Sequence, residues 1–500
     1  MAYTSISTPP SGVAVPIVLI FGISVWLLRR LCSPLRKVPG PFWTRWTRLW
    51  YLDKIWKGDF QRTNIDLHKK YGPIVRIAPN ECSLDGPDAI RAIYGHGTHY
   101  VKAPWYFASS PVGSDNDNLF TDFDVQRHAT NRRKVASLYS MTSMLKWEHC
   151  VDESTRALLR QFREFVQSRQ PINLQLWLQY FAFDTISLIT LNKSFGLVEQ
   201  GRDNHGFLDA LHAYLIYCAN VGVYSELHPV LGRLVSLLPS KGMSWMVGFV
   251  RAQVRGRIEH IKPKEYASAE DNDFLGTILR MHGQNPDKIK LGDVYGFPLT
   301  NIGAGSDTTS VSLVGIIYNL MICPQKLQRL QDEIDQADKA GQLSELVTFQ
   351  EAQRLPYLQA CIKEGLRMHP ATGLPLARVV PKEGANIMGT FFPGGTVVGV
   401  NSWVAHANIE VFGPDAESFR PERWLESTEK TSTMERSFLA FGAGSRTCIG
   451  KNISLMEISK IVPELIRRFN FTLTDPHAEI KMENVWFVKQ KNIHCSVTSR

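Results

Sequence analysis

The residues of this chain best suited to metal or redox chemistry lie in a glycine-rich loop that runs from Phe441 to Gly450. Glycine also stands at 442 and 444 of this loop, and glycines let a backbone turn tightly and approach a flat cofactor closely. Cys448 stands where the loop enters a helix that we expect to begin near Lys451. Amide N–H groups and the helix dipole at such a place favour a thiolate over a thiol. The loop therefore suits a soft, electron-rich sulfur ligand for a metal.

Other interpretations of this loop compete with the ligand interpretation. A dinucleotide-binding fingerprint fails, because Thr447 stands where the third glycine belongs and no strand-helix unit with a downstream acid surrounds it. A cysteine hydrolase using Cys448 lacks a motif that supplies a histidine base. A buried structural cysteine beside a turn is the commoner case for any single cysteine. Taken alone, the loop leaves the ligand and the buried-cysteine interpretations equally open.

At this loop the sequence resembles the cytochrome P450 family of haem-thiolate monooxygenases, and the resemblance covers nearly the whole chain. Every fixed position of the family's haem-binding loop, FGxGxRxCxG, is met here. The resemblance implies that Cys448 is the proximal ligand to the iron of haem b, that Phe441 shields its sulfur, and that Arg446 reaches a haem propionate. On haem iron a thiolate pushes electron density toward O–O cleavage.

Glu364 and Arg367 lie three residues apart and therefore share one face of an expected helix. An isolated pair of this spacing is usually a surface ion pair worth under about 1 kcal/mol. In the family the pair lies before the haem loop and is locked by a further arginine, which the resemblance places at Arg423. We expect these three residues to form a structural network on the proximal side and not to be catalysts.

A second family motif lies at 304–309, where polar residues interrupt an apolar helical stretch. Asp307 could cap a new helix. Apolar periodicity on both sides favours one helix instead, bent or ended only upstream at Pro298. The segment matches the family's AGxDT motif, which implies that the small residues at 303–305 make room for dioxygen. It also implies that Thr308 offers a hydroxyl and that Asp307 relays protons from solvent, as general acid catalysis requires.

Haem carries two propionates, which need cationic partners. The resemblance assigns this role to Arg132, Arg378 and Arg446. It adds His128, which replaces the family's frequent tryptophan and keeps a ring N–H donor, and it leaves His406 as a further candidate.

The N-terminal stretch from Gly12 to Leu28 contains no charge, and none precedes it. Its length lies at the short end of what spans a bilayer, and no basic start or cleavage site marks a signal peptide. Arginines at 29 and 30 follow, so the positive-inside rule places the rest of the chain in the cytosol. A buried core helix at a domain edge is the alternative.

We therefore expect a short lumenal tail over 1–11, a single-pass transmembrane anchor over 12–31, and a Pro-rich linker over 32–45. The haem-thiolate monooxygenase domain is expected over 46–500, on the cytosolic side of the endoplasmic reticulum membrane. This topology keeps the glycosylation sequons at Asn192, Asn452 and Asn470 free of sugar.

The composition is that of an ordinary globular enzyme of 500 residues. The net charge of +9 is modest and no basic block occurs, which argues against nucleic-acid binding. Near-average glycine and proline contents exclude collagen-like and disordered chains. The eight cysteines form no CxxC pair, so a disulfide scaffold or zinc ribbon is excluded in favour of a reducing compartment.

Periodicity predicts a predominantly α-helical chain with a small β region, and the resemblance implies the cytochrome P450 fold, a single large haem domain behind the anchor. Helices are predicted at 152–166, 177–191, 207–219, 293–323, 355–368 and 453–469. Strand-like alternation occurs at 74–77, 396–400 and 493–497. Polar stretches at 262–273 and 283–293 are predicted to be loops.

No flavin domain fits after Cys448, so electrons must come from a partner, by resemblance NADPH-cytochrome P450 reductase with cytochrome b5 as a second donor. A basic proximal surface would steer an acidic donor, although a generally solvated basic face is equally consistent. Its candidate residues are Arg132, Arg133, Lys134, Lys451, Lys460, Arg467 and Arg468.

The expected function is a membrane-bound monooxygenase that hydroxylates, demethylates or epoxidises a hydrophobic small molecule. Aromatic residues at 105–107 and the stretch 128–140 are similar to those of filamentous-fungal members related to pisatin demethylase, which indicates secondary-metabolite biosynthesis or detoxification. Pocket walls are expected at 102–119, after Pro370, and at 486–487. A haem-thiolate isomerase or dehydratase and a non-catalytic membrane haem-binding protein are the alternatives, and neither needs the Asp307–Thr308 relay.

Overall fold

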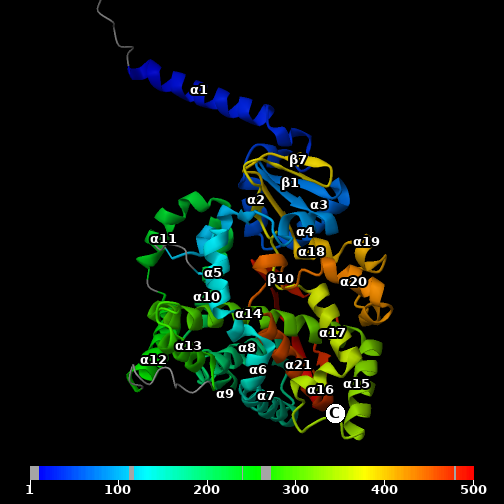
Figure 1. Cartoon of the computed structure of the whole chain (residues 1–500). Coiled ribbons are helices and arrows are strands. Elements are labelled where there is room, and N and C mark those ends of the chain that lie inside the picture. The colour runs from blue at the N-terminus through cyan, green and yellow to red at the C-terminus, as the bar shows by residue number, and fades with distance from the viewer. Residues whose placement is uncertain (1–10, 112–117, 239, 261–271, 478–479) are drawn as a thin grey trace, which may run out of the picture.

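The computed structural model describes residues 11–111, 118–238, 240–260, 272–477 and 480–500, and it consists mainly of helices with several short strands (Figure 1). The long helices are α1 (Ser11–Leu31), α7 (Glu148–Ser168), α8 (Leu174–Leu191), α10 (Phe207–Val223), α12 (Lys241–His260), α14 (Leu291–Ile322), α15 (Pro324–Lys339), α17 (Pro356–Met368) and α21 (Lys451–Arg468). Shorter ones include α2 (Leu49–Trp56), α5 (Val125–Val135), α11 (His228–Ser236), α13 (Phe274–Gln284) and α18 (Ser402–His406).

The helical core is built around α14, which packs against α8, α17 and α21. Nearly every residue of α8 is buried, and this explains why α8 is apolar on all sides and not amphipathic. The predicted helices are each found at the expected place, with ends that differ by a few residues. Helix α14 continues through Pro298, so this proline neither ends the helix nor leaves Asp307 at a helix start.

A β-rich region lies at one end of the helical core (Figure 1). Its main sheet has the strand order β1-β2-β8-β5-β3, with β2 and β8 parallel and the other pairs antiparallel. The strands are β1 (Ile74–Ala78), β2 (Glu81–Leu84), β3 (Val101–Lys102), β5 (Arg378–Val379) and β8 (Val397–Val400). All three predicted strand regions are confirmed, the third as β12 (His494–Ser499).

Three smaller sheets complete the fold. Strands β10 (Lys481–Val485) and β11 (Phe487–Lys491) form an antiparallel hairpin, and β11 lies against α14. Strands β4 (Ile172–Asn173) and β9 (Phe469–Leu473) flank β12, while β6 (Ala385–Ile387) pairs with β7 (Thr390–Phe392). The predicted loop at 262–273 lies largely outside the described residues. The one predicted at 283–293 is shorter, because α13 and α14 extend into it.

Helix α1 extends away from the body as a separate rod (Figure 1). In the described part of the chain, no helix taken singly is both long and apolar enough to cross a membrane, so the anchor stays a prediction. Residues 1–10 of the expected lumenal tail lie outside the described residues. The segment expected to be a stiff, non-helical linker contains two 3-10 turns, Pro34–Lys37 and Phe42–Arg45, and Leu35 and Val38 pack into the β-rich core.

Candidate active site

The glycine-rich loop folds back on itself between α20 (Thr428–Ser437) and α21. The Cys448 N–H donates to the carbonyl oxygen of Phe441 at 2.8 Å, and α21 begins at Lys451 as predicted. Gly444 has φ +63°, and a Cβ built there would lie 1.7 Å from the carbonyl oxygen of Tyr94. Only glycine fits this close approach, so the loop geometry requires this residue of the motif.

Cys448 is surrounded by protein groups and yet has an exposed side chain. Burial raises the pKa of the Cys448 thiol, whereas the N–H groups of Gly450 and Lys451 and the nearby Arg132 guanidinium lower it. The backbone N–H groups thus lower the thiol pKa as the sequence predicts. In the protein without a bound metal, however, burial raises the pKa of the Cys448 thiol by more than these groups lower it. A coordinating metal ion deprotonates a thiol outright. The exposed sulfur therefore faces a space that a metal-bearing group could occupy.

The middle of α14 presents a second uncovered surface within an otherwise buried helix. Ala304 is exposed and Thr308 is partly exposed, and a Cβ built on Gly303 would meet no atom within 4 Å. The Thr308 Oγ1 hydroxyl donates to the Ala304 carbonyl at 2.8 Å. Gly305 has a different role from the one predicted, because a Cβ there would lie 3.0 Å from Ile186 of α8. Gly305 allows close helix packing, while Gly303 and Ala304 leave open space.

Helices α14 and α21 are tied together beside this space, since Thr309 Oγ1 lies 2.9 Å from Ser454 Oγ. Asp307 points elsewhere and is almost fully buried. Its Oδ1 accepts from Gln179 Nε2 at 2.7 Å, and its Oδ2 lies 2.7 Å from Lys489 Nζ of β11. Neither partner of Asp307 was predicted from the sequence. The Asp307 side chain is 1% exposed, so the predicted relay of protons from solvent would have to reach Asp307 through its neighbours, and this role stays a prediction.

Four cationic residues from separate elements converge near the loop: Lys102 of β3, Arg132 of α5, Arg378 of β5, and Arg446. Burial lowers the pKa of Arg446 to about 10, and repulsion from Arg378 and Arg132 adds to the effect while Asp122 opposes it. Burial, together with Arg378 and Arg446, lowers the pKa of Lys102 well below its usual range. These residues repel one another in the absence of a bound anion.

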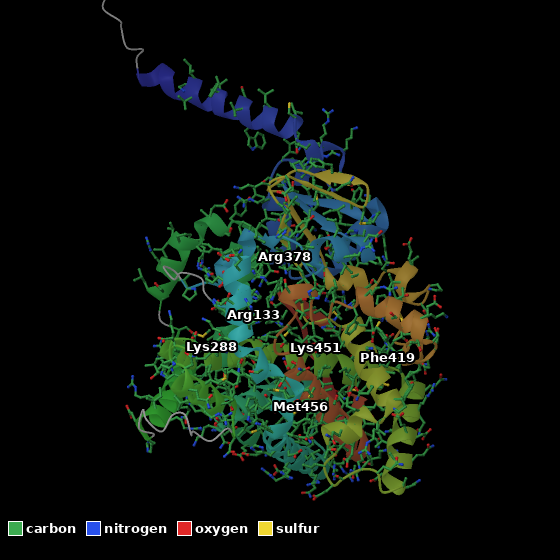
Figure 2. The ribbon with its side chains drawn as sticks, viewed as in Figure 1. Arg133, Lys288, Arg378, Phe419, Lys451 and Met456 are labelled. Atoms are coloured by element: carbon green, nitrogen blue, oxygen red, sulfur yellow. The ribbon has the colours of Figure 1, made fainter. Side chains whose placement is uncertain are left out.

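The cationic cluster fits a group with two carboxylates. Arg446 Nη1 donates to the Asp122 carbonyl at 2.8 Å, but its buried Nη2 has no hydrogen-bond partner among the described residues. Arg378 Nη1 donates to the Ala377 carbonyl at 2.9 Å, and its guanidinium lies over the ring of Tyr94. Figure 2 shows Arg378 toward the β-rich region and Lys451 at the start of α21. The predicted propionate partners Arg132, Arg378 and Arg446 thus lie together.

His128 belongs to the same cluster and is buried. Burial, with repulsion from Arg446, Lys102 and Arg132, lowers its pKa to about 3, so the ring is neutral near pH 7 and keeps one N–H donor. Lys102 was predicted only as part of a pocket wall. Its Nζ donates to the Phe120 carbonyl and lies 4.5 Å from the Tyr106 ring centroid. No pattern in the sequence distinguishes Lys102 from the other lysines as buried. Its place in the cationic cluster could therefore not be predicted.

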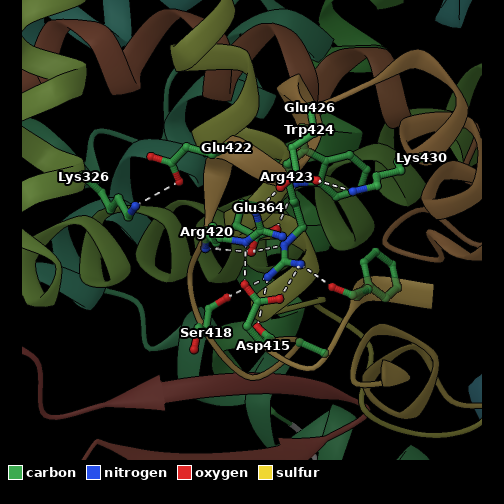
Figure 3. A network of polar contacts seen from close by, with 12 residues as sticks. Lys326, Glu364, Asp415, Ser418, Arg420, Glu422, Arg423, Trp424, Glu426 and Lys430 are labelled. Carbon is green, nitrogen blue, oxygen red and sulfur yellow. Dashed lines mark hydrogen bonds and ion pairs between the residues drawn. The ribbon is translucent and has the colours of Figure 1, made fainter. Parts of the chain in front are cut away.

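Glu364, Arg367 and Arg423 form a buried ion network, as predicted. Figure 3 shows Glu364 and Arg423 with their neighbours Asp415, Arg420 and Trp424. Arg367 binds the Glu364 carboxylate through Nε at 2.9 Å and Nη2 at 2.8 Å, and Arg423 Nε reaches Glu364 Oε1 at 3.0 Å. Two further donors complete the site, the Trp424 indole and the Arg420 backbone N–H, each 2.9 Å from a carboxylate oxygen. All the groups are satisfied, which makes a buried ion cluster tolerable.

His406 does not lie with the propionate partners, and that expectation is corrected. Its Nδ1 lies 2.9 Å from the Arg367 carbonyl and its Nε2 accepts the Leu439 N–H at 2.8 Å. Burial lowers the pKa of His406 to about 3, with repulsion from Arg367 as a smaller cause. Its two ring nitrogens are both used, so His406 is a connector between the Glu364 network and the segment that leads into Phe441.

Aromatic residues gather where pocket walls were predicted. Trp105 and Trp486 lie with ring centroids 4.6 Å apart, and Tyr106 meets Trp486 edge-on at 5.8 Å. The segment after Pro370 joins them, because the Gly373 N–H donates to the Trp486 carbonyl at 2.9 Å. Residues 112–117 of the first predicted wall lie outside the described residues.

The family model described as cytochrome P450 matches residues 37–495. The chain belongs to the cytochrome P450 family. It is 40% identical over 483 residues to a pisatin demethylase of Fusarium vanettenii, covering 95% of this chain and 91% of that protein. It is 37% identical over 499 residues to the cytochrome P450 monooxygenase gsfF of Penicillium aethiopicum, covering 97% and 98% of the two chains.

Membership in the cytochrome P450 family makes this chain a haem-containing monooxygenase, an oxidoreductase of the P450 fold. Family members bind haem b through a cysteine thiolate, act on hydrophobic substrates and take electrons from redox partner proteins. Not every basic residue predicted for the partner surface is available for it. Lys460 is buried and paired with Glu148 at 2.7 Å and Asp152 at 2.9 Å.

Arg467 and Arg468 are also engaged, with Asp338 at 2.6 Å and Glu464 at 2.7 Å respectively. Arg133, Lys134 and Lys451 keep exposed or partly exposed side chains near the cysteine loop. The predicted docking surface is thereby reduced to these three residues and the half-buried Arg132.

Proposed function

We propose that this chain inserts one oxygen atom from dioxygen into a hydrophobic small molecule, and that Cys448 is the residue that would hold the haem iron through its thiolate. The observation that carries the proposal is the exposed sulfur of Cys448 deep in the protein, together with the open surface at Gly303, Ala304 and Thr308. Bound haem would supply the redox and oxygen-activating chemistry. The polypeptide supplies the ligand, the charge balance and the proton donors.

Each group around the proposed haem site has a separate task. Arg132, Arg378 and Arg446, with Lys102 and His128, are the residues that would hold the propionates by charge-assisted hydrogen bonds. Phe441, whose carbonyl accepts the Cys448 N–H, would shield the sulfur from water. The Thr308 hydroxyl can donate a proton or hydrogen bond into the open space, since its present acceptor is a backbone carbonyl of its own helix. Asp307 lies next along the helix and returns protons to this side.

The substrate class we propose is a methoxylated aromatic compound, which the enzyme demethylates. One relative is named a pisatin demethylase, and its similarity extends along nearly the full length of both chains. The aromatic side chains of Trp105, Tyr106 and Trp486 pack on one another at the predicted pocket wall, with only Trp105 partly exposed, and such an aromatic wall suits a planar substrate. Oxidation at a methoxy carbon releases formaldehyde and leaves a phenol, so the product is easily measured.

We also propose attachment to the endoplasmic reticulum membrane, with the P450 domain in the cytosol. The described surface carries exposed apolar side chains on two segments, residues 42–56 and 227–238, and the first is tied to the end of α10 because Arg48 Nη1 donates to the Val223 carbonyl at 2.9 Å. These side chains are 49–76% exposed: Phe42, Trp43, Leu49, Trp56, Leu227, Val230, Leu234, Leu237 and Leu238. Apolar side chains of this kind suit burial in lipid, together with helix α1, whose residues 12–28 carry no charge.

Expression with NADPH-cytochrome P450 reductase tests the reaction. Microsomes that carry both proteins should consume NADPH and release formaldehyde and a phenol from pisatin, and microsomes with the Cys448→Ala variant should not. If the microsomes oxidise another hydrophobic compound but release no formaldehyde from pisatin, the proposed monooxygenase reaction stands and the proposed substrate class is wrong. Product formation without NADPH or dioxygen would indicate the isomerase alternative. Release of the chain from membranes by alkaline carbonate would contradict the membrane proposal.

A further inference from the structure

Asp307 is held from two sides by residues of other elements. Gln179 comes from α8 and Lys489 from β11, far along the chain from α14. The side chains of Asp307 and Lys489 are 1% and 8% exposed, so their 2.7 Å ion pair is one of the most buried in the described chain. Removing one partner of such a pair leaves an uncompensated buried charge, which is strongly destabilising. Lys489 therefore fixes where the Asp307 carboxylate lies.

The strand that supplies Lys489 also carries a predicted pocket wall. Phe487 begins β11, two residues before Lys489, so the two side chains lie on the same face of the strand. Trp486 precedes β11 with φ +85°, and its ring packs on Trp105. A second bond ties the strand to α14, since Gln490 Nε2 donates to the Val311 carbonyl at 3.0 Å. Strand β11 thus connects the predicted pocket wall at 486–487 to the Asp307 carboxylate.

Charged groups on the solvent side of Lys489 complete its surroundings. Glu483 of β10 is its cross-strand partner, and Glu483 Oε2 lies 3.0 Å from His212 Nε2 of α10 and pairs with Lys491. The Glu483 and Lys491 side chains are 31% and 45% exposed. Exposure thus increases from Asp307 to Lys489, Glu483 and Lys491, and the charges alternate in sign. Lys489 lies between a buried acid and an acid that reaches solvent.

We propose that Lys489 is a positioning residue for proton delivery, and that β11 couples the Asp307 carboxylate to occupation of the substrate pocket. A substrate that presses on Trp486 or Phe487 shifts the strand that holds Lys489, and with it the acid next to Thr308. No bond is made or broken in this step apart from hydrogen bonds, and the proton that Asp307 gives up is regained from the solvent side. The inference rests on the proposed function.

The test compares Lys489→Met with Lys489→Arg and with Lys491→Met, a matched substitution on the same strand that breaks the exposed pair. All are assayed as haem-loaded enzyme with the reductase and pisatin as the probe. We expect Lys489→Met to lower kcat at least about tenfold, as loss of general-acid delivery does, with KM within about twofold. Lys489→Arg should restore most of kcat, and Lys491→Met should behave as wild type.

An unfolding measurement gives a readout that needs no substrate. In a double-mutant cycle on the haem-loaded protein, Lys489→Met alone should destabilise more than the double variant Lys489→Met with Asp307→Asn, because the double variant leaves no buried charge unpaired. The double variant also serves if Lys489→Met alone does not fold, and its kcat should then be as low. If the two substitutions have additive effects on the free energy of unfolding, Lys489 and Asp307 do not interact as proposed. If Lys489→Met has the same kcat as Lys491→Met, Lys489 has no positioning role. If the haem-loaded wild-type protein lacks the absorption of a thiolate-ligated haem in its reduced carbon monoxide complex, the proposed function is wrong, whatever the outcome for Lys489.

Discussion

Arg367 and His406 bind each other twice. The Arg367 Nη1 donates to the His406 carbonyl at 2.8 Å, and the His406 Nδ1–H donates to the Arg367 carbonyl at 2.9 Å. The remaining ring nitrogen of His406 accepts the N–H of Leu439, two residues before Phe441. A continuous set of buried hydrogen bonds therefore runs from the Glu364 carboxylate to the entrance of the cysteine loop. The network on α17 holds the loop through this histidine.

Replacing His406 by alanine should loosen the cysteine loop. The Leu439 N–H and the Arg367 carbonyl would both be left buried without a partner, which costs about 1–3 kcal/mol for each group. We expect a lower free energy of unfolding and faster loss of haem from the His406→Ala protein. His494→Ala, at an exposed position of β12, is the control and should match wild type in both measurements. Unchanged haem retention in His406→Ala would show that the loop holds itself.

Acid should destabilise the fold through buried neutral histidines. Burial lowers the pKa of His369 to about 4 and that of His406 to about 3, both below the usual value of 6.5. The unfolded chain takes up these protons below pH 6.5 and the folded chain does not, so the free energy of unfolding falls as pH falls from about 6.5 toward 4. The expected loss at pH 5.5 is about 1.4 kcal/mol for each histidine.

Denaturant unfolding at pH 7.5, 6.5 and 5.5 measures this dependence. The variants His369→Gln and His406→Gln replace a titrating ring by an amide that keeps a donor and an acceptor. Each should show a shallower decrease between pH 6.5 and 5.5 than wild type. Curves parallel to wild type would mean that these rings do not titrate as their burial requires.

Lys102→Met separates cofactor binding from folding. Lys102 is buried among arginines, and the pKa of its ammonium is lowered by burial and by Arg378 and Arg446. Methionine fills a similar volume without the charge, so the haem-free protein should be as stable as wild type or more stable. Haem should dissociate about tenfold faster, since one charge-assisted hydrogen bond of about 1.5–3 kcal/mol is lost.

Haem transfer to an apo-globin acceptor, together with unfolding of the haem-free protein, measures both effects of Lys102→Met. Arg133→Met removes an exposed charge of α5 next to Arg132 and is the matched control. A Lys102→Met protein that loses stability without faster haem loss would reveal a purely structural lysine.

The sequence predicted what depends on local pattern. The helix after Cys448, the helix across Asp307 and the ion cluster at Glu364 each follow from spacing along the chain or from a motif. The main departures concern contacts between distant segments. Lys489 meets Asp307 because a C-terminal hairpin packs on α14, and Lys102 joins the arginines because β3 pairs with β5. No periodicity encodes such meetings.

The wrong predictions have physical reasons of the same kind. His406 was a further candidate propionate partner, but both of its ring nitrogens bind backbone groups of the protein. Lys460 was assigned to the surface because lysines are rarely buried, whereas two carboxylates on α7 make its burial possible. Gly305 was read as room for dioxygen, and only the position of Ile186 shows that it serves helix packing.

The most direct test of the account is the spectrum of the reduced carbon monoxide complex of the purified protein. Wild type loaded with haem should give the absorption typical of a thiolate ligand, and the folded Cys448→Ala variant should not. A Cys448→Ala protein that keeps this absorption, or a folded wild-type protein that stays colourless with excess haemin, would contradict the assignment of Cys448 and with it the proposed function.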